Sequence, residues 1–269
     1  MFVASNSVPT PEIVWWALLP VIVFAVSGVL LLTISSLLKK EISWLAPGIS
    51  LTAGIFVLLS SIPMWNRIQN DGPISFLNNS VGTDGSTIFL TSLIAIALIS
   101  TSILARPYLS REGIPDLEFY VLLLLSAAGG VVMAGANDLI VLFLGIEILS
   151  IAVYVLVALH LRKIESQEAS IKYFLLGAFS SAFLLYGIAL VYGAVGTTNL
   201  VEIRNFLATS LLIEDGMLMI GFALMLVGLG FKVAVFPFHA WTPDATKVPQ
   251  HLLLFGWLPV LKSQDLLQY

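Results

Sequence analysis

Seven apolar segments, each close to the length that crosses a bilayer, follow one another along this 269-residue chain. A helix needs about 20 apolar residues to span the hydrocarbon core. In lipid every backbone polar group must be satisfied within the structure, which favours helices. The sequence therefore predicts an all-α membrane protein, a polytopic transmembrane helix bundle of about seven spans at residues 13–38, 42–62, 86–104, 118–134, 139–161, 170–195 and 216–237.

The composition limits the chemistry that this chain can carry. Hydrophobic residues make up 58% of it and charged residues only 10%, whereas about a quarter of a soluble domain is charged. Cysteine is absent, which excludes disulfides, thiolate-held iron–sulfur clusters and cysteine-based zinc sites. No glycine-rich nucleotide loop follows a strand pattern, and no basic run suggests nucleic acid. We therefore expect no cofactor or metal in this chain and assign any redox chemistry to partners.

The polar connections give the expected course of the chain. Residues 63–85, rich in Pro, Asn, Asp and Gly, are predicted to form a solvent loop. Residues 135–138 are predicted to make a tight turn between the fourth and fifth spans. Residues 197–215 alternate apolar and charged side chains, a pattern that suits a short helix lying on the membrane surface.

The distribution of basic residues predicts the orientation in the cell membrane, since cytoplasmic loops are enriched in Lys and Arg. Only Arg67 and Arg204 lie in the second, fourth and sixth loops. This places the odd-numbered loops in the cytoplasm and the N-terminus outside. No basic segment precedes the first apolar stretch, so no cleaved signal peptide is expected. The odd-numbered loops hold Lys39, Lys40, Arg106, Arg111, Arg162 and Lys163.

Glu147 is the most informative single residue. It lies eight residues past the start of its apolar segment, which is roughly 12 Å deep at 1.5 Å per residue. A carboxylate at such a depth costs at least ~2.5 kcal/mol and needs a cation, water or a proton. Such residues usually face a hydrated path, so Glu147 is a candidate for proton translocation. The alternative is a fixed ion pair that only orders the bundle.

Lys232 is the second buried charge, and its neighbours indicate a broken helix. Gly228 and Gly230 precede it and Pro237 follows it, so we expect the helix to be interrupted around this lysine. A lysine shielded from water exchanges its proton more readily than an exposed one. The alternative is that Lys232 extends to the inner interface, a few residues away.

Two further candidates lie nearer the predicted interfaces. Lys172 stands close to the inner end of the sixth span, where extension of the side chain to the interface is the simpler interpretation. His239 follows the seventh span, and imidazole gains and loses protons near neutral pH. His160 closes the fifth span and suits an ordinary interfacial role. Because the depths of Glu147 and the two lysines differ, we expect water rather than direct contact to link all three.

These charges lie in three stretches that resemble the proton-translocating, antiporter-like subunits of NADH–quinone oxidoreductase (respiratory complex I). The stretches are Asn137–Leu159, Ala169–Leu200 and Gly228–Asp244. The run Ile171–Ser181, with the sequence IKYFLLGAFSS, resembles subunit N in particular. The resemblance covers most of residues 115–244, and residues 1–114 agree only in hydropathy.

The resemblance implies a role for each of these residues. Glu147 matches the family's glutamate on the fifth helix, and Lys232 matches the lysine on a broken seventh helix whose proton affinity that glutamate modulates. Lys172 matches a bridging lysine, and His239 a link to the central polar axis. The family subunit works beside other membrane subunits of complex I. NADH, FMN, iron–sulfur clusters and quinone are bound by other subunits of the complex.

The chain departs from the family pattern after residue 245. Family members continue with about as many helices again, including a second broken helix. Loss of one base from codons for Tyr-Lys-Gly-Ala-Pro-Thr would produce Thr246–His251, so we expect a frameshift there. The predicted organisation is N-terminal helices 1–3 with loops at 1–114, an incomplete translocation module at 115–244 and an out-of-frame tail at 245–269. A divergent but genuine C-terminus is the alternative. Such a fragment alone is expected not to pump.

Two other functions fit parts of the pattern. A subunit of an Mrp-type cation/proton antiporter would share the glutamate and the Lys232-type lysine, but the segment around Lys172 favours subunit N. A structural membrane scaffold would keep the buried charges as fixed pairs. A soluble-type enzyme is disfavoured, because the sequence has no nucleophile–base set and no metal-ligand cluster.

Overall fold

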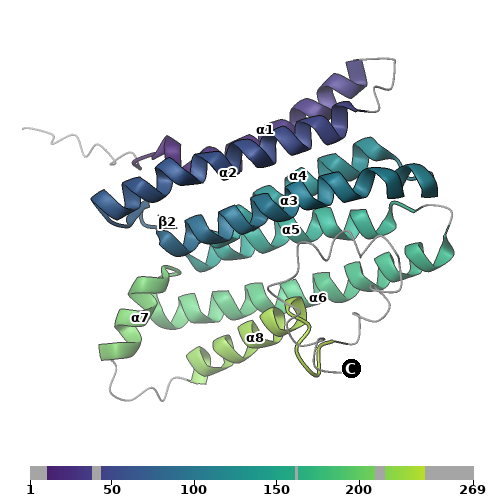
Figure 1. Ribbon diagram of the computed structural model, residues 1–269. Coiled ribbons are helices and arrows are strands. Elements are labelled where there is room, and N and C mark those ends of the chain that lie inside the picture. Colours follow the sequence, from purple (N-terminus) through teal and green to yellow (C-terminus); the bar gives the residue numbers. More distant parts are fainter. Residues whose placement is uncertain (1–10, 38–43, 161–162, 210–215, 240–269) are drawn as a thin grey trace, which may run out of the picture.

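The computed structural model describes residues 11–37, 44–160, 163–209 and 216–239. Within these ranges the chain forms eight helices and one antiparallel two-stranded sheet (Figure 1). In chain order the elements are α1 (Trp15–Leu37), α2 (Leu45–Asp71), β1 (Ile74–Phe76), β2 (Val81–Thr83), α3 (Gly85–Glu112), α4 (Asp116–Ala134), α5 (Leu139–Ala158), α6 (Ile164–Val195), α7 (Leu200–Thr209) and α8 (Gly216–Lys232).

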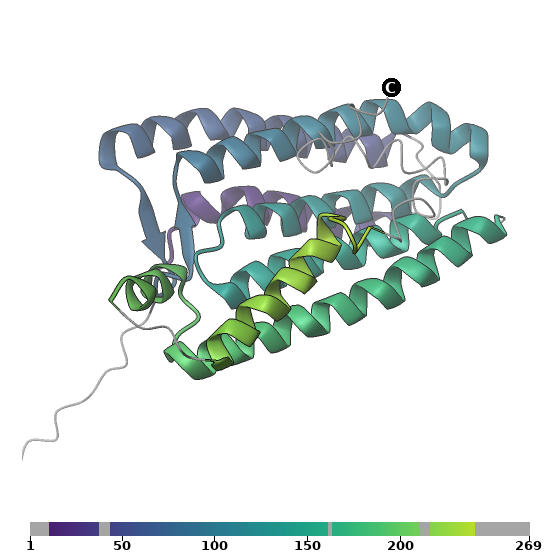
Figure 2. The same ribbon diagram turned by 90° about the horizontal axis from the view of Figure 1, so that it is seen from below.

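The described helices confirm the predicted multi-pass, all-α membrane architecture. Six of them, α1 to α6, are long and apolar enough to cross a membrane. The seventh predicted span corresponds to α8, which is apolar but has 17 residues and ends at Lys232 rather than at residue 237. The long helices lie side by side, while α7 sits across one end of the bundle and α8 runs obliquely against α6 (Figures 1 and 2).

The prediction of a solvent loop at 63–85 was wrong in its first part. Helix α2 continues through Pro63 to Asp71 and ends at Gly72, whose φ of 83° favours glycine. In this last part the Arg67 guanidinium lies 5.2 Å from the ring centre of Trp16 on α1, a cation–π contact. Strands β1 and β2 then form a short hairpin in which Ile74 pairs with Thr83.

The other helix ends also differ from the predicted boundaries. Helix α3 extends past residue 104 to Glu112, and Gly113 ends it with a φ of 65°. Helix α6 begins at Ile164, six residues before the predicted start. The predicted turn at 135–138 and the predicted short helix within 197–215 are both present, the latter as α7.

Three connections meet in a hydrogen-bonded layer at one end of the bundle, which we name the polar cap: residues 74–83, 135–138 and 197–199. The backbone amide of Gly82 donates to the carbonyl of Gly135 at 2.8 Å, and the side chains of Asn137 and Asn199 both donate to the carbonyl of Asn79. Of these side chains Asn199 is buried, and a buried amide needs such a partner to avoid a desolvation cost. The cap therefore fixes how the α1–α4 half meets α5 and α6.

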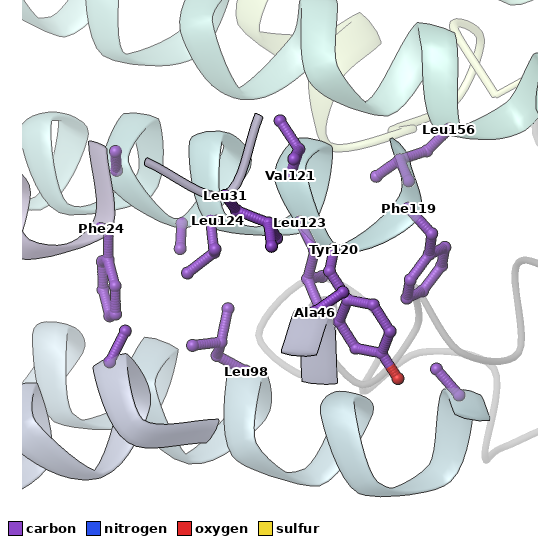
Figure 3. Close-up of a cluster of buried hydrophobic side chains, with 14 of the residues drawn as sticks. Phe24, Leu31, Ala46, Leu98, Phe119, Tyr120, Val121, Leu123, Leu124 and Leu156 are labelled. Carbon is purple, nitrogen blue, oxygen red and sulfur yellow. The ribbon is translucent and has the colours of Figure 1, made fainter. Parts of the chain in front are cut away.

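Two large hydrophobic clusters and a small one around Val157 and Ala169 form the core of the described part of the chain. The first joins α1 to α4 and contains Phe24, Leu98, Tyr120 and Leu124, all fully buried (Figure 3). The second joins α5, α6, α7 and α8. Each fully buried side chain of this size contributes roughly 1.5–3 kcal/mol relative to exposure in water. Within a bilayer, close packing carries more of the association between helices.

The opposite end of the bundle carries an ion-pair cluster around Glu112, the last residue of α3. Its carboxylate lies 3.0 Å from the Lys163 ammonium and 3.5 Å from Nε2 of His160. The His160 side chain is buried, and its interfacial role stays a prediction. This cluster ties the end of α3 to the connection between α5 and α6.

Candidate functional site: a buried acid–base pair between α5 and α8

Helix α5 presents a polar stripe inside the second half of the bundle. Glu147, Ser150 and Tyr154 are spaced by three and four residues, so they lie on one face of the helix. Ser150 and Tyr154 are both buried. The rest of α5 is almost wholly apolar, which is why this stripe faces α6 and α8 and not lipid.

Lys232 meets this stripe from the end of α8. Its Nζ lies 3.6 Å from Oε1 of Glu147 and donates hydrogen bonds of 2.9 Å to both Ser150 Oγ and the Tyr154 hydroxyl. Ser181 of α6 donates to the same Glu147 oxygen. The side chains of Lys232 and Glu147 are 12% and 22% exposed. Three helices therefore contribute to one compact site.

The hydrogen bonds decide whether this arrangement is favourable. Placing two charged side chains at membrane depth costs roughly 5–7 kcal/mol together on insertion scales. Their mutual attraction at this separation is about 5 kcal/mol with an effective dielectric constant near 20. The ion pair alone is thus close to balance, and the hydroxyl groups of Ser150, Tyr154 and Ser181 supply the remaining stabilisation.

Helix α6 supports the site by packing closely against both α5 and α8. A Cβ atom on Gly177 would lie 2.0 Å from the Tyr154 hydroxyl oxygen, so only glycine leaves room for that hydroxyl. One turn later, Ser180 Oγ donates a 2.9 Å hydrogen bond to the carbonyl of Gly228 on α8. Small residues at such crossings let helix backbones come together in membranes.

The interruption expected around Lys232 is present as the end of α8. Helix α8 is not interrupted at Gly228 or Gly230, and regular helix ends only at Lys232. Gly228 packs against Leu184 of α6, where a Cβ atom would lie 2.6 Å from the leucine Cβ. Gly230 makes room for the ring of Phe238, which folds back over it. Both glycines therefore serve close packing, and Pro237 lies in the turns that follow the helix.

The other two predicted residues, Lys172 and His239, are not part of the ion pair between Glu147 and Lys232. Lys172 is half exposed and forms a 2.7 Å ion pair with Glu168, one turn earlier on α6. The neighbouring Tyr173 packs its ring 4.7 Å from that of Tyr154. His239 is exposed in the turns after α8, with its ring 5.6 Å from that of Phe236.

The expectation that water rather than direct contact links all three charges was wrong for Glu147 and Lys232, whose side chains form an ion pair. For Lys172 it stays a prediction. Depth counted along separate straight helices ignored the oblique course of α8 (Figure 2). Sequence reasoning also missed Ser150, Tyr154 and Ser181. The first two follow Glu147 by three and seven residues, on the same helix face, but this spacing gains meaning only once Lys232 is known to lie beside them. No group of three or more metal-ligating His, Asp or Glu side chains occurs among the described residues.

Comparison with known proteins identifies the family. The family model described as NADH:quinone oxidoreductase/Mrp antiporter, TM, matches residues 136–255, a range that contains Glu147, Lys172, Lys232 and His239. NADH-quinone oxidoreductase subunit N of Trichlorobacter lovleyi is 36% identical over 227 residues, which cover 84% of this chain and 46% of the relative. Subunit N of Myxococcus xanthus is 43% identical over 161 residues, or 60% of this chain and 31% of the relative.

The chain belongs to this family. The predicted resemblance to subunit N is confirmed by these relatives, and the chain spans about half the length of the curated relatives it matches. The segment predicted to be out of frame, 245–269, lies outside the described residues.

Solved structures agree with the family assignment. A chain of the respiratory complex I from Thermus thermophilus with bound aureothin matches with a TM-score of 0.70 and 30% identity, covering 87% of this chain and 49% of that chain. The Mrp complex from Dietzia sp. DQ12-45-1b contains a chain with a TM-score of 0.68 and 20% identity, covering 86% and 43%. The second likeness shows the shared fold alone.

Proposed function

We propose that this chain is a proton-translocating, non-redox membrane subunit of an NADH–quinone oxidoreductase. The observation that carries the proposal is the buried pair of Glu147 and Lys232, held by hydroxyl groups from α5 and α6. Ionisable pairs inside membrane bundles mark ion and proton paths more often than fixed structure. The relatives named subunit N support the choice of complex.

The chemistry follows from two groups that influence each other's charge. While Glu147 is ionised and close to Lys232, the ammonium form of the lysine is favoured by about 5 kcal/mol of attraction. When Glu147 becomes neutral or moves away, that attraction is lost and Lys232 releases its proton more easily. A change of charge at Glu147 thereby drives uptake or release of one proton at Lys232, without any electron transfer in this chain.

The same proposal assigns the surroundings. Other membrane subunits of the complex would contact this chain, and they or peripheral subunits would bind NADH, FMN, iron–sulfur clusters and quinone. We place the chain in the cell membrane with its N-terminus outside. The support is the clustering of Arg106, Arg111 and Lys163 at one end of the bundle, with Arg67 and Arg204 at the other. Lys172 and His239 would continue the proton route beyond Lys232.

The test is replacement of Glu147 by glutamine in the native gene, followed by measurement in membrane vesicles. Glutamine keeps an oxygen that accepts the Ser181 hydrogen bond but removes the charge that acts on Lys232. We expect the complex to assemble and oxidise NADH, with fewer protons translocated per NADH, measured by a pH-sensitive dye in the vesicles.

The matched control is Glu202→Gln, which changes an exposed carboxylate on α7 that accepts a hydrogen bond from Thr197. This variant should keep the parent's ratio of protons to NADH. An assembled Glu147→Gln complex that translocates protons at the parent's ratio would overturn the proposed function.

A further inference from the structure

Tyr154 stands at the junction of all three helices that build the site. Its hydroxyl oxygen accepts a 2.9 Å hydrogen bond from the Lys232 ammonium of α8. Its ring packs edge-on against Tyr173 and Phe174 of α6, at 4.7 and 5.7 Å between ring centres. Ser170 of α6 donates a 3.1 Å hydrogen bond to the Tyr154 backbone carbonyl. The tyrosine is therefore fixed from α6 while its hydroxyl faces the lysine.

Gly177 sets the position of that hydroxyl. A Cβ atom at residue 177 would lie 2.0 Å from the hydroxyl oxygen and 2.7 Å from the ring carbon that bears it. Contacts this short do not occur between unbonded carbon and oxygen atoms. Alanine at 177 would thus displace the hydroxyl from Lys232 by moving the end of the tyrosine ring.

A phenol differs from a carboxylate in what it offers to lysine. Ionised Glu147 only accepts hydrogen bonds, so it holds the ammonium form of Lys232. That hold is lost when Glu147 becomes neutral or moves away, which is the condition under which the lysine releases its proton. The Tyr154 hydroxyl accepts from the ammonium, and it donates its own hydrogen to the amine nitrogen once the proton has left. The phenol keeps its own proton in both states, so no further acceptor is required.

The geometry points to Tyr154 as a positioning residue that holds Lys232 in place in both of its protonation states, with Gly177 providing the space for its hydroxyl. If this hydroxyl is removed, the Ser150 hydroxyl is the one hydrogen-bond partner that Lys232 keeps among the residues that the structure describes. This inference rests on the proposed function, because it concerns how Lys232 is held between successive proton transfers.

The experiment compares Tyr154→Phe and Gly177→Ala with the parent, in the native complex in membrane vesicles. One lost hydrogen bond corresponds to about a threefold to tenfold change in occupancy of the correct lysine position. We expect a fall of about that size in the rate of proton translocation in each variant. The deficit should grow from pH 6 to pH 9, because the neutral lysine depends most on the lost hydroxyl. A merely structural defect would lower the rate equally at every pH.

A double variant separates the two explanations of Gly177→Ala. If alanine acts through the tyrosine hydroxyl, Tyr154→Phe combined with Gly177→Ala should be about as slow as the slower single variant. Independent damage would instead multiply the two losses. If the two losses multiply, the role assigned to Gly177 is overturned. If the deficit of Tyr154→Phe does not change with pH, the role assigned to Tyr154 is overturned.

Two control variants lie on α6, the helix that contains Gly177. Gly193→Ala places its new Cβ at an ordinary 3.5 Å from Met217, and Tyr186→Phe removes a hydroxyl from an exposed ring. Both should match the parent. If Glu147→Gln impairs proton translocation while Tyr154→Phe does not, this inference fails and the proposed function stands. If Glu147→Gln also has no effect, the proposed function itself fails.

Discussion

The close approach of α8 to α6 at Gly228 gives a quantitative test of how the site is positioned. Alanine at 228 would put its Cβ 2.6 Å from Cβ, and 3.0 Å from Cα and the backbone nitrogen, of Leu184. A backbone neighbour cannot rotate away as a flexible side chain can. The new methyl group therefore has to push the two helices apart at this crossing.

The magnitude follows from three contributions. Overpacking of this kind costs about 1–3 kcal/mol, and separating the helices loses the hydrogen bond from Ser180 to the Gly228 carbonyl, worth about 0.5–1.5 kcal/mol. Alanine regains about 1 kcal/mol of helix propensity over glycine. The net destabilisation of Gly228→Ala is then about 0.5–3.5 kcal/mol. Because Lys232 follows one turn later, the same displacement moves its ammonium away from α5.

Thermal unfolding of the chain purified in detergent measures the first effect, and proton translocation in vesicles measures the second. Gly216→Ala is the matched control, since nothing lies within 4 Å of its new Cβ and it sits at the start of the same helix. We expect Gly228→Ala to melt below the parent and Gly216→Ala to melt at or above it. A Gly228→Ala chain with the parent's melting temperature and full proton translocation would refute the packing argument.

Two further predictions concern the ends of the bundle. Asn199→Ala removes the side-chain hydrogen bond to the Asn79 carbonyl and the N-cap of α7. It should lower the free energy of unfolding, measured by chemical denaturation, by about 1–2 kcal/mol. The control is Asn205→Ala at an exposed position of α7, and equal stability of the two variants would count against a stabilising role of the polar cap. Glu112→Gln removes the charge that binds Lys163 and should lower the melting temperature slightly at low salt; the difference from the parent should vanish near 1 M salt, where screening is strong, and a salt-independent difference would contradict an ionic role.

The number and order of the helices were predictable because the bilayer allows so few alternatives. A run of apolar residues near 20 long has to be a span, and this alone located α1 to α6. The ends were less predictable, since they depend on local contacts. Pro63 looked like a stop, yet α2 ends at Gly72, where the chain needs a positive φ, and Arg67 is held by Trp16.

The site was predictable only where its chemistry was costly. Glu147 and Lys232 stood out because charged side chains rarely lie within apolar segments. Ser150 and Tyr154 did not, because a serine or tyrosine on an apolar helix is commonplace and each becomes meaningful only beside Lys232. That proximity depends on the oblique course of α8, which the pattern of apolar residues does not encode.

Glu147 and Lys232 differ in their positions along their helices. Glu147 lies within continuous helix, where moving it would break backbone hydrogen bonds at membrane depth. Lys232 ends α8, and the carbonyls left open by that ending are satisfied by the following turns: Val233 donates to Leu229, and Val235 donates to Gly230. A helix can stop within a bundle only where such partners exist. The lysine therefore stands at a helix end whose open carbonyls find partners in the following turns, whereas the glutamate stands within a continuous helix.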